Sequence, residues 1–187
     1  MTTTKAPLSV VILAAGRGTR MKSRLPKVLQ TLAGQPLLGH VLKLGATLAA
    51  DQTVIVYGHG GDAVKAAFAD PAIRWAEQAE QLGTGHAVLQ AMDQIEAGHR
   101  VLILCGDVPL LTSETVQRLL DETPSGDVGV LTVRTPNPHG YGRIVRNDDG
   151  NVIAIVEQKD ATEAQLAIDE INSGVFVVPA QSLHQLL

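Results

Sequence analysis

The stretch Leu8–Leu13 most constrains the fold, because it is a short apolar run, rich in β-branched residues, that ends at a glycine loop. Such a run is typical of a strand buried on both faces of a sheet. Similar runs occur at 53–57 and 101–105, and apolar residues at helical spacing predict helices over 37–48, 62–69 and 84–95. Strands that alternate with helices favour an α/β fold with a mostly parallel sheet flanked by helices.

The pattern changes near residue 128. Short strands are expected at 128–133, 143–146 and 152–157 with no helix between them, and the Asp-Gly pair before Asn151 predicts a hairpin. A buried strand at 174–178 precedes a helix that begins at Ala180 and stops with the chain. We therefore expect one domain, 1–187, incomplete at its C-terminus, with a soft division into 1–127 and 128–187.

The composition narrows the class of protein. The chain has 187 residues, 45% of them hydrophobic, and one cysteine, Cys105. A chain of this length buries a core without disulfides or metals, which excludes disordered, disulfide-rich and zinc-finger classes. The sequence has no apolar run of about 18 residues, and Met1–Pro7 lack the apolar segment of a signal peptide. We expect a cytoplasmic protein with no membrane partner.

Charge is distributed unevenly along the chain. Residues 1–50 contain seven basic side chains and no carboxylate, whereas the whole chain has 15 basic and 19 acidic residues. A cationic N-terminal region in an acidic protein suits a small polyanionic ligand, although the same residues would also serve as solvated surface charges. A nucleic-acid-binding protein would normally be basic overall, so we expect no nucleic-acid partner.

The loop after Leu13 contains Gly16, Gly18 and several basic residues. Backbone N–H groups in a glycine loop between a strand and a helix can cradle phosphate oxygens. Met21 stands where the dinucleotide fingerprint needs its third glycine, and no acidic residue follows about 20 positions later. The P-loop pattern fails as well, because Met21 replaces its second glycine and no Gly-Lys-Ser/Thr follows. The sequence predicts a phosphate-binding loop of another class.

The string Leu-Ala-Ala-Gly-Arg-Gly-Thr-Arg-Met at 13–21, followed by Pro26-Lys27, resembles the signature of the sugar-nucleotide pyrophosphorylases. These proteins are nucleotidyltransferases with a Rossmann-like GT-A fold, in which the loop wraps a nucleoside triphosphate. A second cluster at 78–87 places glutamine amides, which can read a base edge, before a glycine turn that opens a helix. Alone, that cluster also fits a polar loop in which Thr84 is the helix N-cap.

Together the two motifs resemble the N-terminal uridyltransferase domain of the bifunctional bacterial N-acetylglucosamine-1-phosphate uridyltransferase and glucosamine-1-phosphate acetyltransferase. The resemblance covers essentially the whole chain, and it continues through the motifs at 106–110, 140–144, 157–161 and 170–174. It implies uridylyl transfer from UTP to N-acetylglucosamine 1-phosphate. The products would be pyrophosphate and UDP-N-acetylglucosamine, a precursor of the cell envelope.

The resemblance also implies roles for single residues. Arg20 would hold the leaving phosphates, Lys27 the α-phosphate, and Asp107 a Mg²⁺ cofactor. Asp107 follows a predicted buried strand, at the edge where ligands of open α/β sheets collect. Its other possible role, as the cap of a helix that starts near Thr112, suits the spacing less well. Arg17, Lys22 and Arg24 would add to the positive field or would simply be solvated.

The implied substrate-binding residues fall into two groups. Those around the uridine and the phosphates are Leu13, Ala14, Ala15, Gly16, Lys27, Gln78, Gln81, Gly83, Thr84, Cys105, Gly106 and Asp107. Those around the sugar are Gly142, Glu157 and Asn172. Residues 1–127 would then be a nucleotide-binding half and 128–187 a sugar-binding half. His59 and His86 lack metal-ligand spacing and a nucleophile partner, so both are interpreted as structural.

The sequence departs from the family in two respects. Cys105 stands where the family often has tyrosine, and the family's second metal ligand, an asparagine, lies beyond residue 187. The hexapeptide-repeat domain, which carries acetyltransferase activity and builds the family's trimer, is also absent from the sequence. Two alternatives stay open: another nucleotidyltransferase of this fold, such as a cytidylyltransferase, and a nucleotide-binding module without turnover.

Overall fold

The computed structural model describes residues 6–187 apart from residues 17, 19, 20 and 24 and the side chain of His184. The chain divides into two compact units. One contains the residues up to Gly129 together with Phe176–Leu187, and the other is Val130–Val175. No helix within the described residues combines the length and the apolar character that crossing a bilayer requires.

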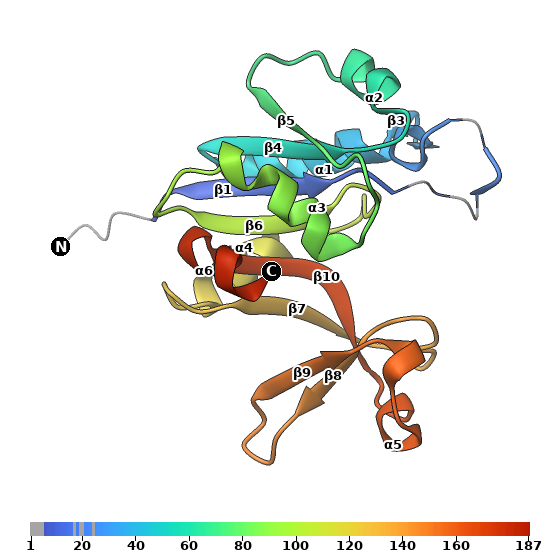
Figure 1. The fold of residues 1–187 in the computed structure, drawn as a ribbon, viewed down its shortest axis with the longest axis vertical. Coiled ribbons are helices and arrows are strands. Elements are labelled where there is room, and N and C mark those ends of the chain that lie inside the picture. The colour runs from blue at the N-terminus through green and yellow to red at the C-terminus, as the bar shows by residue number, and fades with distance from the viewer. Residues whose placement is uncertain (1–5, 17, 19–20, 24) are drawn as a thin grey trace. The chain divides into compact units, whose positions relative to one another are not determined.

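The first unit is built on a mostly parallel sheet (Figure 1). Its strands, in spatial order, are β5 (Ile73–Glu77), β4 (Gln52–Tyr57), β1 (Leu8–Leu13), β6 (Arg100–Cys105) and the last part of β10 (Glu170–Pro179). The first four strands run parallel, and β10 is antiparallel to β6. Val11 on the central strand is paired with Val54 and Ile103, and all three are buried. The predicted fold class is confirmed.

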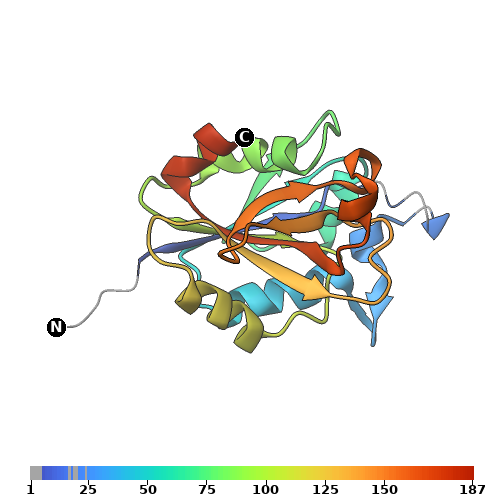
Figure 2. The same cartoon turned by 90° about the horizontal axis from the view of Figure 1, so that it is seen from below.

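Helices cover both faces of this sheet (Figure 2). One face carries α3 (Thr84–Ala91) and α6 (Ala180–Leu186), and the other carries α1 (Leu37–Thr47) and α4 (Ser113–Glu122). The Thr112 hydroxyl caps α4 by accepting a hydrogen bond from Thr115 N at 3.3 Å. The remaining elements are η2 (Lys27–Leu29), β2 (Thr31–Leu32), β3 (Gln35–Pro36), α2 (Gly61–Ala67) and η3 (Met92–Gln94).

The second unit consists largely of antiparallel strands. Its elements are most of β7 (Gly129–Arg134), β8 (Arg143–Arg146), β9 (Val152–Val156), η4 (Gln158–Asp160), α5 (Glu163–Leu166) and the first part of β10. β8 pairs with β9, and both β7 and β8 pair with β10. Gly150 has a φ of +83° and donates to Asn147 O at 2.9 Å in the turn between β8 and β9. The predicted hairpin is confirmed.

A buried carboxylate, Glu170, anchors the start of β10 in the second unit. Both of its oxygens accept hydrogen bonds from the Arg146 guanidinium, at 2.6 and 2.9 Å. Arg134 lies 3.5 Å from the same carboxylate. The hydrogen bonds from Arg146 are the largest cause that lowers the pKa of Glu170 from its ordinary 4.5 to about 2; burial opposes the shift, and a bond from Thr132 adds to it. Glu170 is therefore ionised in the folded protein near neutral pH.

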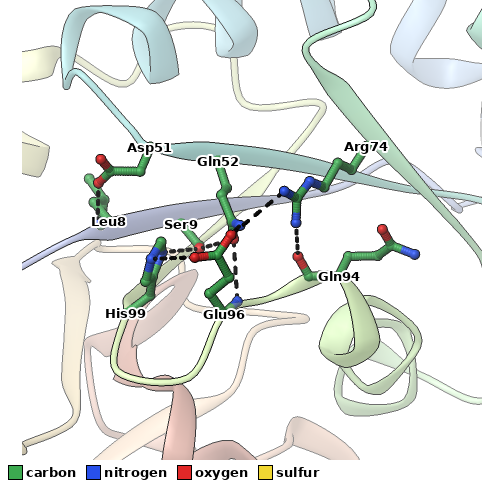
Figure 3. Close-up of polar contacts among 8 residues, drawn as sticks. All are labelled: Leu8, Ser9, Asp51, Gln52, Arg74, Gln94, Glu96 and His99. Carbon is green, nitrogen blue, oxygen red and sulfur yellow. Dashed lines mark hydrogen bonds and ion pairs between the residues drawn. The ribbon is translucent and has the colours of Figure 1, made fainter.

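A second polar network joins the amino ends of the central strands in the first unit (Figure 3). The Ser9 hydroxyl lies 2.9 Å from Gln52 Oε1 and 2.8 Å from His99 Nδ1, and all three residues are buried. Gln52 Nε2 donates to Glu96 Oε1 at 2.5 Å, and Gln52 Oε1 accepts from Glu96 N at 3.3 Å. Arg74 reaches the network through an ion pair with Glu96. The Gln52 carboxamide thus bridges β1 and the segment that precedes β6.

We predict that Glu170→Gln makes the free energy of unfolding depend less on pH under acidic conditions. A carboxyl pKa that is lower in the folded state stabilises the protein above pH 4.5, and this contribution disappears as the pH falls through about 2. It amounts to at most about 3 kcal/mol, because Arg146 and Arg134 are partly exposed to water. Urea denaturation from pH 2 to pH 7 measures it. If the free energies of unfolding of the unmodified protein and of Glu170→Gln differed by the same amount at every pH in this range, the prediction would be contradicted.

We also predict that Gln52→Leu lowers the free energy of unfolding by about 1–2 kcal/mol, because the buried Ser9 hydroxyl loses a partner. Adding Ser9→Ala removes the hydroxyl that has lost this partner. The double variant should therefore lose less stability than the sum of the two single variants, as measured by urea denaturation. If the loss in the double variant equalled the sum of the two single losses, Gln52 would not act as a bridge to Ser9.

Candidate active site

The site begins where β1 and β6 end side by side. Gly106 N donates to Leu13 O at 2.9 Å, and Ala14 N donates to Val56 O at 2.8 Å. A Cβ at position 106 would lie 3.1 Å from Leu13 O, tighter than most such contacts, so glycine lets the two chain segments approach. This close approach places Asp107 beside the loop that follows β1.

A cavity of about 270 Å³ opens at this edge of the sheet. Its lining residues are Leu13, Ala15, Gly16, Gln78, Gln81, Gly83, Thr84, Ala87, Cys105 and Asp107. Apart from Ala87, every one of them belongs to the set expected around the uridine and the phosphates. Ala87 lies three residues after Thr84 on α3, so helical spacing is the signal that could have identified it.

Two glutamine side chains are fixed at this cavity by backbone carbonyl groups. Gln78 is 4% exposed and donates from Nε2 to Gly83 O at 3.0 Å. Gln81 donates from Nε2 to Ala15 O at 2.8 Å, which ties its loop to the glycine loop after β1. Each carboxamide thus has a defined orientation before any ligand binds.

The N-cap of α3 is not the residue that one interpretation of the sequence proposed. Gly83, not Thr84, is the N-cap of α3, and no side chain caps the helix. Gly83 has a φ of +114°, in the left-handed region that favours glycine, and its carbonyl accepts from Ala87 N at 3.1 Å. Thr84 is instead the first helical residue and lines the cavity. The N-cap role considered for Thr84 is therefore wrong.

Lys27 and Asp107 form an ion pair, with side chains that are 37% and 26% exposed. Lys27 is the first residue of η2, the short helix that follows Pro26. A Cβ at Gly18 would lie 2.7 Å from Lys27 Cβ, so the glycine loop passes directly against this lysine. The arrangement brings one cation and one carboxylate to the edge of the cavity.

Cys105 ends β6 and lines the same cavity. Burial raises the pKa of its thiol, the nearby Asp107 carboxylate raises it further, and Lys27 partly opposes both effects. The thiol is therefore protonated near neutral pH, and a thiolate nucleophile is not favoured there.

The three residues expected around the sugar lie together in the second unit. Asn172 N donates to Gly142 O at 2.9 Å, and Asn172 Oδ1 accepts from Gly174 N at 2.9 Å. A Cβ at Gly142 would lie 3.2 Å from Glu157 Oε1. Glycine at position 142 therefore leaves room for the Glu157 carboxylate.

Some predicted site residues are not cavity residues of the described structure. Arg20, proposed for the leaving phosphates, lies outside the described residues, as do Arg17 and Arg24. Ala14 and Gly106 are buried, and their backbone N–H groups hydrogen-bond to neighbouring strands. Among the described residues, no three His, Cys, Asp or Glu side chains gather as a potential metal cluster.

The chain matches the MobA-like NTP transferase domain family over residues 10–166. It is 56% identical over 182 residues to the Bifunctional protein GlmU of Halorhodospira halophila and 54% identical over 179 residues to that of Acinetobacter baumannii. These alignments cover 97% and 96% of this chain. The chain spans only 38% and 39% of the length of those two relatives.

Solved structures share the fold at lower identity. HddC from Yersinia pseudotuberculosis superposes with a TM-score of 0.71 at 22% identity, over 95% of this chain and 79% of its own. The inositol-1-phosphate CTP transferase from T. maritima gives 0.75 at 17% identity, over 96% and 73%. The resemblance expected from the motifs is thus confirmed by the relatives, and the Rossmann-like fold by these structures. The chain belongs to the MobA-like NTP transferase domain family and is a nucleotidyltransferase.

Proposed function

We propose that this nucleotidyltransferase transfers uridylyl from UTP to N-acetylglucosamine 1-phosphate and releases UDP-N-acetylglucosamine and pyrophosphate. The observation that carries the proposal is the cavity at the ends of β1 and β6, where two fixed glutamine amides and the Lys27–Asp107 pair meet. The amides offer hydrogen bonds to a base, and the charged pair suits phosphates and a cation. The similarity to GlmU proteins supports this choice of substrates.

The proposed reaction is an in-line displacement at the α-phosphorus of UTP. A phosphate oxygen of the sugar phosphate forms the new P–O bond, and the bond to the pyrophosphate leaving group breaks. Little proton transfer is needed, so the protein acts mainly by positioning two mutually repelling anions and neutralising their charge. We assign Lys27 to the α-phosphate and Arg20 to the leaving phosphates.

Asp107 suits a magnesium ion, because Mg²⁺ is usually bound by one or two carboxylates together with substrate phosphates. In the described structure the same carboxylate already attracts the Lys27 ammonium group, so it is directed at a cationic partner. Bound there, Mg²⁺ would neutralise phosphate charge. Asp107 would hold the ion, and Lys27 would become available to the nucleotide.

The sugar is assigned to Gly142, Glu157 and Asn172, which lie together in the second unit. A carboxylate and an amide can hydrogen-bond sugar hydroxyls and an acetamido group. On this assignment, 1–127 is the nucleotide-binding half and 128–187 the sugar-binding half of one domain. For the protein as a whole we propose a cytoplasmic trimer that supplies cell-envelope precursors.

Calorimetric titration of the chain with UDP-N-acetylglucosamine, UDP-glucose and CDP-glucose tests the proposed substrates. We expect the first ligand to bind most tightly, and Gln78→Ala to weaken its binding roughly tenfold through loss of the fixed amide. Gln117→Ala, at a half-buried position of α4 that does not line the cavity, is the matched control. Tighter binding of the CDP ligand would favour a cytidylyltransferase and overturn the uridine assignment.

The role of Asp107 can be tested by titrating UTP with and without Mg²⁺. In the unmodified chain we expect Mg²⁺ to tighten UTP binding several-fold, and Asp107→Asn should abolish this effect by removing the carboxylate charge. Asp149→Asn, which alters an exposed carboxylate in the β8–β9 turn, should preserve it. A Mg²⁺ effect that survives in Asp107→Asn would show that the ion is held elsewhere.

A further inference from the structure

Gln78 can take only one orientation in the described structure. Its Nε2 lies 3.0 Å from Gly83 O, and a backbone carbonyl oxygen can only accept a hydrogen bond. The nitrogen end of the carboxamide must therefore face Gly83. The same Nε2 lies 3.1 Å from Nδ1 of His86, in the first turn of α3. These two contacts use both N–H groups of the amide.

This orientation fixes the tautomer of His86. Because Gln78 donates to Nδ1, that nitrogen carries a lone pair, and the proton of the neutral imidazole is on Nε2. The Gln90 carboxamide, one helical turn later, lies 3.2 Å from His86 Nε2. Gln90 Nε2 also donates to His86 O, at 3.3 Å, a longer bond than the 3.0 Å bond that orients Gln78. Rotating the half-buried Gln90 amide by 180° gives up this longer bond, and its oxygen then accepts from His86 Nε2–H. Donation then runs in one direction, from Gln78 to His86 and from His86 to Gln90.

These hydrogen bonds leave one polar group of Gln78, the oxygen Oε1, for a ligand. Both N–H groups are occupied, Gln78 lines the cavity, and within the described residues its Oε1 accepts no hydrogen bond. The site therefore offers an acceptor at this point. An acceptor suits a base edge that presents an N–H, such as N3–H of uracil, whereas cytosine has a bare nitrogen at that ring position.

We propose that His86 is a positioning residue that locks the Gln78 carboxamide with Oε1 toward the base, and so helps to select the uracil edge. The inference rests on the proposed uridine site. It departs from the interpretation of His86 as a structural residue, because the imidazole contacts the amide that would read the base. His86 would act through Gln78 and would not itself touch the ligand.

The first test is a double-mutant cycle read by calorimetric titration with UDP-N-acetylglucosamine. His86→Leu removes the acceptor for Gln78 and should weaken binding roughly tenfold. His86→Asn can place Oδ1 near the position of Nδ1 and should recover most of the affinity. In the Gln78→Ala background, His86→Leu should have no further effect. His40→Leu, on α1, is the control for loss of a histidine and should bind normally.

Two results would overturn the proposal: an equal loss from His86→Leu in both backgrounds, or an asparagine variant that binds no better than the leucine variant. Either result would mean that His86 only supports α3. If the unmodified chain binds no uridine nucleotide, the proposed function fails, and the following measurement still decides the role of His86.

The second test needs no ligand. Long-range ¹H–¹⁵N NMR correlations near neutral pH distinguish the protonated from the bare nitrogen of His86, and we expect the proton on Nε2. The Gln78 side-chain amide protons should exchange slowly with water in the unmodified chain and faster in His86→Leu. A proton on Nδ1, or an exchange rate that His86→Leu leaves unchanged, would contradict the proposed lock.

Discussion

The hydrogen bond between Gly106 N and Leu13 O is the contact on which the candidate site depends. It holds the end of β6 against the end of β1 without a side chain between them. As a result, Asp107 emerges beside the loop that runs past Lys27. Parallel pairing makes this possible, because the carboxyl ends of neighbouring parallel strands meet at one edge of the sheet.

The polar contacts at the amino ends of the sheet strands differ from those at the carboxyl ends. At the amino ends, Ser9, Gln52 and His99 are buried and hydrogen-bonded, and Glu96 and Arg74 continue the network to the surface. At the carboxyl ends, the Gln78 and Gln81 carboxamides donate to backbone carbonyl groups, and both side chains line the cavity. The network at the amino ends stabilises the sheet, and the polar groups at the carboxyl ends are available for binding. This contrast is expected where stability and ligand recognition share one set of strands.

The sequence predicted the central strands well, because β-branched apolar runs such as Leu8–Leu13 occur where a strand is buried on both faces. It did not predict β5, in which Arg74 and Glu77 interrupt the apolar pattern at the edge of the sheet. It also placed the start of β10 too late. Glu170 looks like a loop residue until Arg146, 24 positions earlier, pairs with it in the fold.

The candidate site shows the same division between local pattern and tertiary contact. The motifs identified nearly all residues that line the cavity, since they are read as contiguous strings. They could not reveal that Gln78 and His86 meet, because that contact depends on the turn at Gly83 and on the ring orientation. Sequence alone assigns residue types to a site, whereas the direction of each hydrogen bond needs coordinates.

The raised pKa of Cys105 has a chemical consequence for this cavity. Alkylating reagents and peroxides attack the thiolate, and a thiol with a raised pKa supplies little of it near neutral pH. Cys105 is the single cysteine of the chain, and it lies on the cavity wall. The raised pKa therefore disfavours oxidation of this cysteine. A tyrosine at this position would supply a phenol hydroxyl instead, whereas cysteine keeps the wall small, weakly polar and uncharged.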